Sequence, residues 1–385
     1  MVILAVLLAA VMPILTNSPF TLWLNRSLIF LVVSCPCALV ISVPLSFFGG
    51  IGGASRQGIL IKGSNFLEAL SKAETLVFDK TGTLTEGVFR VTDYSPAAEK
   101  ERLLELAALA ESGSNHPIAR SVLEAYGKEI DRGRLGDVQE LAGMGVKAVI
   151  DEKTVLVGNR KLMETFGLTC MEDTDTGTVV HVASDGIYLG SLLITDSIKP
   201  EAPKAIADLK DLGITKTVIL TGDTKEAAKA VAETLKIDKF VAGLLPDEKL
   251  TLAEEMMNQN GKGTLVFIGD GMNDAPVLSR VDVGIAMGAM GQDAAIEASD
   301  IVLMDDSPAK LPMAVTIARR TMAIVRQNIV FALSVKAIVL LLGALGFANM
   351  WIAVFADVGV SVLAVLNAMR ALSVHEKSMT VKLEK

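Results

Sequence analysis

The sequence predicts a multidomain protein in which α-helical transmembrane segments flank an α/β domain, and an α+β domain is inserted into that α/β domain. Three observations support this fold class. Both ends of the chain are long and uncharged, the middle is polar, and the polar part alternates short apolar runs with helical stretches. The mean hydropathy of +0.47 is high for a protein without membrane segments, and 385 residues are enough for two or three domains.

The two ends of the chain are predicted to enter a membrane. Residues 1–25 and 27–55 carry no charge, and neither do residues 337–356 and 358–369. Because a helical span needs about 20 apolar residues, we expect four spans, at about 2–16 (short), 27–50, 327–347 and 350–370. The first segment lacks a basic stretch and a clear cleavage site, and a second span follows closely, which favours a short span over a secretory signal.

Basic residues predict how these spans are oriented. They follow the second span, precede the third and follow the fourth: Arg56, Lys62, Lys72, Arg319, Arg320, Arg326, Arg370 and Lys377. The opposite connections, 17–26 and 347–350, hold only Arg26. The positive-inside rule then predicts a multi-pass protein of the cell membrane, with its polar body in the cytosol.

The net charge of −8 argues against a nucleic-acid partner. Three cysteines offer no disulfide framework, and Cys170 is expected to be a small buried or surface thiol.

The polar body is predicted to form two domains. Strands are expected at 75–78, 216–220, 264–268, 283–286 and 301–304, and helices at 200–211, 224–235 and 247–258. This alternation predicts a parallel sheet with helices on both faces. The insertion starts with a helix and continues with short strands, at Lys100–Glu111, 145–150, 154–157 and 178–183. The expected organisation is membrane helices at 1–55 and 321–372, the split domain at 56–90 and 192–320, the insertion at 91–191 and a tail at 373–385.

A strand that ends in Asp79 is the most informative stretch of the chain. Asp79-Lys80-Thr81-Gly82-Thr83 follows the apolar run 75–78, which places a carboxylate at the carboxyl edge of a sheet, where α/β folds bind ligands. The backbone N–H groups and hydroxyls that follow can wrap a phosphate. A carboxylate so placed can attack a phosphoryl group and hold it as an acyl phosphate. Thr221, after the strand 216–220, could hydrogen-bond phosphoryl oxygens, with Gly222 permitting close approach.

Acidic residues after a second strand predict a cation site beside Asp79. Asp270 and Asp274 follow the strand 264–268. Mg²⁺ prefers carboxylate oxygens, so we expect Asp79 and Asp270 to share this ion.

Six motifs resemble, in order and spacing, those of the heavy-metal-transporting P-type ATPases. They are Cys35-Pro36-Cys37, Asp79-Lys80-Thr81-Gly82-Thr83-Leu84-Thr85, Ser114-Asn115-His116-Pro117, Thr221-Gly222-Asp223, Gly269-Asp270-Gly271-Met272-Asn273-Asp274 and Asp357-Val358-Gly359. The resemblance spans essentially the whole chain. It implies a haloacid-dehalogenase-like phosphorylation domain, an inserted nucleotide-binding domain, and ATP and Mg²⁺ as cofactors.

The resemblance also implies roles for residues in these motifs. Asp79 is the expected nucleophile, and Lys80, Thr81 and Asp223 belong to the same catalytic motifs. Asp79, Thr81 and Asp270 are expected to hold Mg²⁺. The remaining implied roles are phosphate contact by Lys249, orientation of the cluster by Asn273 and Asp274, and a hinge motif at Asp196, in which Lys199 stands where the family often has Arg.

The residue at position 81, Thr81, favours a pump over a phosphatase. Related phosphatases carry an acid/base Asp two positions after the nucleophile, where this chain has Thr81. Without that group the acyl phosphate hydrolyses slowly and survives long enough to drive a conformational change. A membrane-anchored phosphatase and a non-catalytic metal-binding membrane protein remain as alternatives.

The resemblance predicts an adenine site in the insertion. Its residues are Glu111, His116, Gly143, Gly145 and Asn159. Glutamate and histidine side chains can hydrogen-bond or stack on a purine, and the two glycines let the backbone approach the nucleotide. No Walker-type P-loop is present in the sequence.

The apolar ends predict the transported ion. Pro36 would open a helix between Cys35 and Cys37, whose thiolates can ligate a soft or borderline metal. Lys336 and Asp357 are ionisable residues at membrane depth, which mark function by default. Asp357 would be an oxygen ligand and Lys336 its counter-ion once the metal leaves. The resemblance is to the zinc/cadmium/lead-exporting branch, with Cu⁺ or another divalent ion as the alternative, and the sequence does not rank Zn²⁺, Cd²⁺ and Pb²⁺.

Two elements of the family are missing from the sequence. No Thr-Gly-Glu loop of an actuator domain occurs, nor do the family's earlier spans. We therefore expect a C-terminal portion of a pump that binds nucleotide but does not complete a transport cycle alone, and a separate chain could supply the actuator domain. The expected partners are the bilayer, ATP and a heavy-metal ion.

Overall fold

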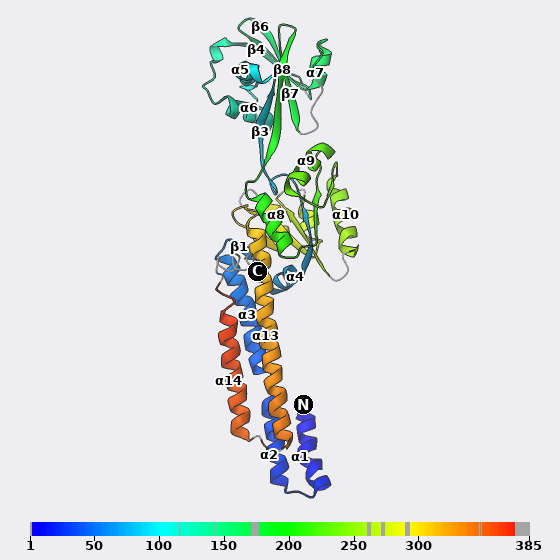
Figure 1. Ribbon diagram of the computed structural model, residues 1–385, viewed down its shortest axis with the longest axis vertical. Coiled ribbons are helices and arrows are strands. Elements are labelled where there is room, and N and C mark those ends of the chain that lie inside the picture. Colours follow the sequence, from blue (N-terminus) through cyan, green and yellow to red (C-terminus); the bar gives the residue numbers. More distant parts are fainter. Residues whose placement is uncertain are drawn as a thin grey trace.

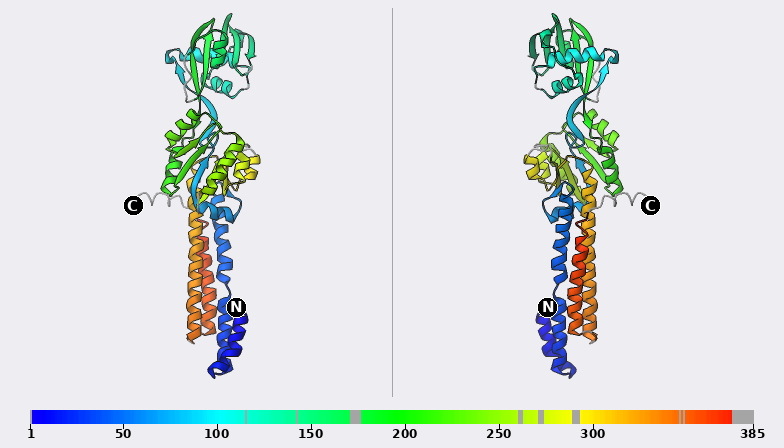
Figure 2. Two further views of the ribbon diagram at one scale, coloured as in Figure 1. Left: turned by 90° about the vertical axis from the view of Figure 1, so that its right-hand side faces the viewer. Right: turned by 90° about the vertical axis from the view of Figure 1, so that its left-hand side faces the viewer.

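Three parts follow one another along the long axis of the molecule. The computed structural model describes residues 2–114, 116–141, 143–170, 177–259, 263–270, 274–288, 293–345, 347 and 349–373. Long helices form one end, a domain around a seven-stranded sheet lies in the middle, and a domain around a six-stranded sheet forms the other end (Figure 1). The side views show the same stacking, with the middle domain between the helices and the outer domain (Figure 2).

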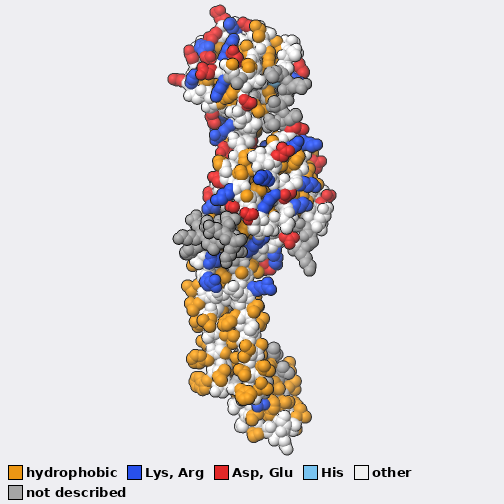
Figure 3. All heavy atoms as spheres, in the orientation of Figure 1, with side chains coloured by type: hydrophobic (Ala, Val, Ile, Leu, Met, Phe, Trp, Pro, Cys, Tyr) orange, Lys and Arg blue, Asp and Glu red, His pale blue; other side chains and the backbone are white. Residues whose placement is uncertain are grey.

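The helices at the apolar end lie at the expected membrane segments, but the segment expected at 27–50 starts earlier, at Phe20, and consists of two helices. They are α1 (Val2–Thr16), α2 (Phe20–Ser34), α3 (Cys37–Ser55), α13 (Lys310–Leu345) and α14 (Met350–Met369). By length and composition, Phe20–Ser55, Lys310–Gly343 and Met350–Met369 can each cross a membrane, and Ala5–Thr16 is a shorter apolar helix. Their surface is covered with apolar side chains, and basic side chains gather where the helices meet the middle domain (Figure 3).

Helix α13 begins earlier than the sequence predicts. The expected span started near residue 327, but the helix starts at Lys310 and runs for 36 residues. Its first turns pack into the core of the middle domain through Leu311, Ala314 and Ala318. Hydropathy alone missed this part because charged residues interrupt it, although it is buried by tertiary packing.

The middle domain has the predicted parallel sheet. The strands are β1 (Ile59–Ile61), β2 (Ala73–Phe78), β9 (Lys216–Leu220), β10 (Lys239–Val241), β11 (Thr264–Gly269), β12 (Val283–Met287) and β13 (Ile301–Leu303), in the order β1-β13-β12-β11-β2-β9-β10. All neighbours pair in parallel except β1, which pairs antiparallel with β13. Two strands of three residues, β1 and β10, were not predicted, because so short a run carries no periodicity.

Helices cover both faces of this sheet. They are α4 (Ser64–Ser71), α8 (Ala202–Asp211), α9 (Lys225–Leu235), α10 (Pro246–Gln259), α11 (Ala275–Leu278) and α12 (Asp293–Ala298). Alternate residues of β2 enter different cores: Phe78 packs with α8, α9 and α13, and Val77 packs with α10 and α11. Burial on both faces explains why β2 reads as a continuous apolar run.

The outer domain is an antiparallel sheet with helices. Its strands are β3 (Thr85–Ser95), β4 (Leu135–Leu141), β5 (Gly145–Ile150), β6 (Lys153–Gly158), β7 (Thr178–Ser184) and β8 (Ile187–Ile198), in the order β3-β8-β7-β6-β5-β4. The helices are α5 (Lys100–Glu111), α6 (Pro117–Tyr126) and α7 (Arg160–Thr165), with 3-10 turns η1 (Ala97–Glu99) and η2 (Arg132–Arg134). The paired strands β3 and β8 link the two domains, so the sequence boundaries near 91 and 191 fall inside them.

Candidate functional site

Three acidic side chains meet at the carboxyl edge of the seven-stranded sheet. Asp79 follows β2, and Asp270 follows the neighbouring strand β11. One carboxylate oxygen from each of Asp79, Asp270 and Asp274 lies within 4.8 Å of those of the other two. The Asp79 N–H donates to the Ile268 carbonyl oxygen at 2.8 Å, which fixes the backbone between the strands. This arrangement agrees with the sequence-based expectation that these carboxylates gather.

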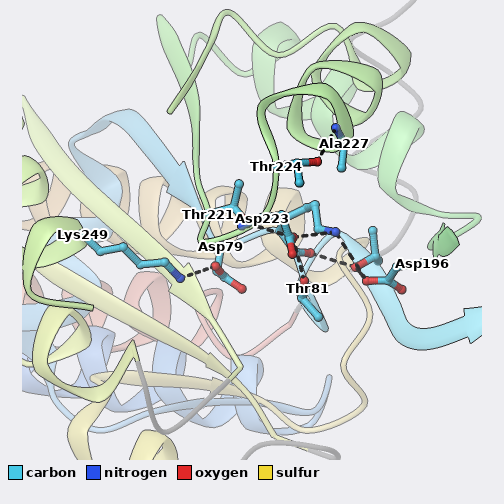
Figure 4. Close-up of polar contacts among 10 residues, drawn as sticks. Asp79, Thr81, Asp196, Thr221, Asp223, Thr224, Ala227 and Lys249 are labelled. Atoms are coloured by element: carbon cyan, nitrogen blue, oxygen red, sulfur yellow. Dashed lines mark hydrogen bonds and ion pairs between the residues drawn. The ribbon is translucent and has the colours of Figure 1, made fainter. Parts of the chain in front are cut away.

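Lys249 neutralises part of this acidic group. Its Nζ lies 2.5 Å from Asp79 Oδ1 and 3.1 Å from Asp274 Oδ1, and all three side chains are buried (Figure 4). Burial, followed by the charge of Asp274, raises the pKa of Asp79 to about 7, against the opposing effect of Lys249. Burial opposes the charge on Lys249, but the two carboxylates outweigh it and leave its pKa above the ordinary value.

The residues around Asp79 fit a divalent cation and a phosphate. Burial, followed by the charge of Asp79, raises the pKa of Asp270 to about 6, and a bound cation would relieve that repulsion. Gly82 has φ +72°, and a Cβ there would lie 1.6 Å from Asp270 Oδ2, so only glycine fits. The hydroxyl of Thr83 is buried and has no hydrogen-bond partner among the described residues. The sequence predicted that the hydroxyls following Asp79 can contact a phosphate, and the buried Thr83 hydroxyl is placed to serve a phosphoryl oxygen.

Asp223 is the common partner of three other predicted site residues. Its Oδ2 lies 2.7 Å from Lys80 Nζ and accepts hydrogen bonds from Thr221 Oγ1 at 3.0 Å and Thr81 Oγ1 at 3.3 Å (Figure 4). Asp223 is held there because Thr224, the next residue, caps α9 by accepting from the Ala227 N–H at 3.3 Å. Hydrogen bonds to the charged form outweigh the effect of burial and hold the pKa of Asp223 below its usual value.

Thr81 is placed at Asp223 and not within the acidic group. Its hydroxyl donates to Asp223 Oδ2, so its predicted role as a Mg²⁺ ligand stays a prediction. Gly222 lies near the Leu244 carbonyl oxygen, 3.1 Å from the place of a Cβ. Asn273 lies outside the described residues, so its predicted orienting role stays a prediction.

The residues of the predicted hinge motif contact the loop that follows Asp79. Asp196 accepts a hydrogen bond from Thr85 Oγ1 and lies 4.0 Å from Lys80 Nζ. Lys199 Nζ donates to the Gly82 carbonyl oxygen at 2.5 Å and to the Asp306 carbonyl oxygen at 2.9 Å. Sequence reasoning noted Lys199 only as a departure from Arg; its two backbone contacts join the loop after Asp79 to the segment that leads into α13.

All five predicted nucleotide residues line one cavity of about 300 Å³ in the outer domain. Glu111, His116, Gly143, Gly145 and Asn159 surround it, and so does Glu140, which was not predicted. Glu111 is buried, and His116 is the N-cap of α6, where its Nδ1 accepts from the Ile118 N–H at 3.3 Å.

Two of these residues also have structural roles. A Cβ at Gly145 would lie 2.2 Å from the Val157 carbonyl oxygen, so the close packing of β5 on β6 already requires a glycine there. Asn159 donates from Nδ2 to the Gly143 carbonyl oxygen at 2.9 Å and caps α7 by accepting from the Leu162 N–H at 3.1 Å. Asn159 therefore braces the glycine loop that borders the cavity.

The membrane helices break at the predicted proline. Helix α2 ends at Ser34 and α3 begins at Cys37, with Cys35 extended and Pro36 between the helices. From α13, Lys336 Nζ lies 3.2 Å from Asp357 Oδ1, 3.0 Å from the Val33 carbonyl oxygen and in contact with the Cys35 carbonyl oxygen. The structure thus brings Lys336, Asp357 and the broken helix together.

The sulfur atoms are in a state that the sequence did not predict. Cys35 and Cys37 are joined by a disulfide, whereas the cysteines were expected to be unpaired and free to ligate metal. Their spacing of two residues brings the sulfurs together where the helix opens. A disulfide offers no thiolate, so ligation by this pair requires the reduced form. Cys170 is free and partly buried, as expected.

The split sheet and the aspartate that ends its central strand define the class of this protein as a haloacid dehalogenase-like hydrolase. A match to that family covers residues 73–282. Over 380 residues the chain is 53% identical to the cadmium, zinc and cobalt-transporting ATPase of Bacillus subtilis, covering 98% of this chain and 54% of that protein. It is 52% identical over 354 residues to the zinc-transporting ATPase of Synechocystis sp., covering 90% of this chain and 48% of that protein.

Two similar solved structures, both of ATPases, identify a narrower family within this class. A zinc-transporting PIB-type ATPase in the E2.Pi state aligns with a TM-score of 0.86 and 36% identity, over 97% of this chain and 62% of that one. The catalytic domain of a CPx-ATPase aligns with a TM-score of 0.53 and 30% identity, over 68% of this chain and 96% of that one. The chain belongs to the heavy-metal-transporting P-type ATPases and is a multi-pass membrane protein. It spans about half the length of the curated relatives it matches.

Proposed function

We propose that the chain takes part in ATP-driven export of a soft divalent metal ion, Zn²⁺, Cd²⁺ or Pb²⁺, through an aspartyl phosphate on Asp79. One observation carries this proposal. The buried Lys249–Asp79–Asp274 group and the intramembrane Lys336–Asp357 pair occur in one chain, and the unbroken helix α13 runs from the catalytic domain to Lys336. The relatives' printed names, which include cadmium, zinc and cobalt transport, support the choice of ion.

The phosphoryl-transfer step follows from the residues around Asp79. A carboxylate oxygen of Asp79 forms a bond to the γ-phosphorus of ATP, the bond to the β–γ bridging oxygen breaks, and ADP leaves with that electron pair. Lys249 supplies positive charge to Asp79 and to the phosphoryl oxygens. The Thr83 hydroxyl, which has no hydrogen-bond partner among the described residues, can donate to a phosphoryl oxygen at this edge of the sheet. The Thr221 hydroxyl would first have to leave Asp223 Oδ2.

Mg²⁺ is the cation that this oxygen-rich site would hold. Asp79, Asp270 and Asp274 are its protein ligands or close neighbours in the proposal, and the ion would neutralise charge on the phosphate. Thr81 has no carboxylate to activate water, which favours a long-lived acyl phosphate.

The metal step uses the pair at the broken helix. Asp357 supplies an oxygen ligand and the reduced thiolates of Cys35 and Cys37 supply sulfur, a donor set that Zn²⁺ accepts. An incoming metal ion takes Asp357 from Lys336, and Lys336 neutralises Asp357 again when the ion leaves. A hard oxygen ligand favours a divalent ion over Cu⁺.

Phosphorylation from radiolabelled ATP tests this function. The chain, under reducing conditions in lipid nanodiscs, is compared with Asp79→Asn and with the Cys35→Ala/Cys37→Ala double variant, with and without Zn²⁺. Acid-stable label that needs both Asp79 and Zn²⁺ supports a coupled metal pump. Label that forms equally without Zn²⁺, or in Asp79→Asn, contradicts it.

The proposal extends to location and partners. The phosphorylation and nucleotide domains face the cytosol, in line with the basic residues at that end of the helices. A separate chain carrying an actuator domain would be a further partner. If so, adding that domain in trans accelerates release of labelled phosphate from Asp79; an unchanged rate of release contradicts this part.

A further inference from the structure

A pair of amide side chains joins the two C-terminal membrane helices. Asn328, on α13, is 1% exposed and donates from Nδ2 to the Ala364 carbonyl oxygen of α14 at 3.0 Å. Asn367, about one turn further along α14, donates from Nδ2 to Asn328 Oδ1 at 2.9 Å. The Oδ1 of Asn367 in turn accepts from Arg370 Nη1 at 2.7 Å. We call Asn328, Ala364 and Asn367 the amide clamp, since its two hydrogen bonds connect α13 to α14.

The amide clamp lies on the same helix faces as the ion pair of Lys336 and Asp357. Helix α13 runs away from the middle domain and α14 returns toward it, so the two helices are antiparallel (Figure 1). Lys336 follows Asn328 by eight residues, and Asp357 precedes Ala364 by seven. Seven or eight residues are about two helical turns, or roughly 11–12 Å, and they return to the same face of a helix. The clamp and the ion pair, whose Nζ and Oδ1 lie 3.2 Å apart, are therefore two contacts of one seam.

Small apolar side chains lie between these two contacts. Ala332 of α13 and Val360 of α14 pack with Ala38 of α3 in one buried cluster. Alanine side chains let helices approach closely but offer few atoms that interlock, so they set no strict register along the helix axes. Hydrogen bonds are directional, and a buried amide that loses its partner is destabilising. The amide clamp therefore limits how far α14 can slide along α13.

A small slide would take Asp357 out of reach of a bound metal ion. Shifting a helix by one residue translates it by about 1.5 Å, whereas the distances between a metal and its ligands hold to within about 0.2 Å. Lys336 can follow such a shift, because its charge sits on a flexible four-carbon stem. Loss of register therefore weakens metal ligation by Asp357 more than it weakens the ion pair.

We propose that Asn328 is a positioning residue for the transported metal ion. With Asn367 it holds α14 in register against α13, and so keeps the Asp357 carboxylate where an ion held by the Cys35 and Cys37 thiolates can bind it. The burial of Asn328, its two hydrogen bonds to α14 and its place two turns from the ion pair support this role. The proposal rests on the function proposed above, since Asn328 acts through Asp357.

A double-mutant cycle tests this role. Zn²⁺ affinity is measured by chelator competition on the reduced full chain in lipid nanodiscs, for the wild type, Asn328→Leu, Asp357→Asn and the variant that carries both substitutions. Leucine is close to asparagine in size and its side chain forms no hydrogen bond. Asn328→Leu should weaken Zn²⁺ binding at least about tenfold, the usual effect of losing a group that orients a metal ligand. The double variant should bind Zn²⁺ as Asp357→Asn does, because the carboxylate that Asn328 positions is already gone.

Co²⁺ separates loss of position from loss of the fold. Charge transfer from thiolate to Co²⁺ reports binding to Cys35 and Cys37, and the d–d bands report the number and geometry of all ligands. Asn328→Leu should keep the charge-transfer band at saturating Co²⁺, because the two thiolates lie outside the seam of α13 and α14. Its d–d bands should match those of Asp357→Asn.

Two further variants complete the set. Asn367→Leu keeps the hydrogen bond from Asn328 to Ala364 and should give a smaller loss of Zn²⁺ affinity than Asn328→Leu; if Asn328→Leu does not fold, the same cycle with Asn367→Leu decides. Thr316→Val is the matched control, since the Thr316 hydroxyl donates to the Pro312 carbonyl oxygen within α13. It removes a side-chain hydrogen bond from the same helix and should bind Zn²⁺ as the wild type does.

The outcomes separate the two proposals. Wild-type Zn²⁺ affinity in Asn328→Leu, or losses that add in the double variant, overturn the inference while the wild-type chain still binds Zn²⁺. Wild-type d–d bands in Asn328→Leu, or an equal loss of affinity in Thr316→Val, also overturn it. Absence of Zn²⁺ binding by the reduced wild-type chain instead overturns the proposed function.

Discussion

Replacing Arg319 with methionine should loosen the base of the catalytic domain. Arg319 lies on α13, and its guanidinium donates to three backbone carbonyl oxygens: those of Ser71 and Ala73, each at 3.2 Å, and that of Leu212. Ser71 ends α4, and Leu212 is the C-cap of α8. The cation therefore satisfies two carbonyls at helix ends, where the helix dipole favours positive charge, and a third at the first residue of β2, Ala73.

The size of the effect follows from these contacts. A hydrogen bond to a charged group contributes about 1.5–3 kcal/mol when fully buried. Arg319 is only partly buried, so water can replace some of the three bonds, and methionine keeps part of the packing. We expect Arg319→Met to lower the local free energy of opening by about 2–4 kcal/mol, which is about 30-fold to 900-fold in an equilibrium constant.

Native-state hydrogen exchange measures this opening directly. The amides of β2 and of the last turn of α8 should exchange faster by that factor, while the amides of the outer domain should not change. Arg320→Met is the matched control, since the neighbouring Arg320, among the described residues, donates to the Arg370 carbonyl oxygen and to Ser373 at the surface. If β2 exchanges at the wild-type rate in Arg319→Met, or as fast in Arg320→Met, the guanidinium does not tie the helix to the strand and the reasoning is refuted.

Three further predictions concern the sites themselves. Gly82→Ala should reduce phosphoenzyme formation at least 100-fold, because its Cβ would lie 1.6 Å from Asp270 Oδ2; an acid-quench assay with wild-type levels of label would contradict this. Thr81→Asp places an acid/base beside Asp223 and should speed hydrolysis of the acyl phosphate at least tenfold, measured by chase of the label with unlabelled ATP. Asp357→Asn should weaken Zn²⁺ binding by the reduced chain at least tenfold in a chelator competition, and an unchanged affinity would remove Asp357 from the ligand set.

Much of the middle domain could be predicted because its signals are local. The apolar run before Asp79, the alternation of strands and helices, and the acidic residues after β11 each lie within a few positions of one another in the sequence. Parallel strands then bring their carboxyl ends to one edge, so Asp79, Asp270 and Asp274 meet without further information.

The unpredicted features depend on contacts between distant segments. Glu140 reaches the nucleotide cavity because β4 is the edge strand beside α5, and no pattern around residue 140 indicates that. Lys199 and Arg319 look like solvated surface charges in the sequence, yet both donate to backbone carbonyls more than a hundred positions away. Gly145 shows the converse. The sequence predicted a nucleotide-binding role for this glycine, but the close approach of the neighbouring strand β6 also requires a glycine there.

The length of α13 makes the helix a lever arm. With a rise of about 1.5 Å per residue, Lys336 lies about 25 Å along the axis from Arg319, which anchors the helix at the catalytic end. A tilt of about 10° around that anchor would carry the Lys336 end sideways by about 4 Å. This exceeds the 3.2 Å that separates Lys336 Nζ from Asp357 Oδ1. A tilt of α13 relative to α14 of about 10° at the anchored end is thus enough to part the Lys336–Asp357 ion pair.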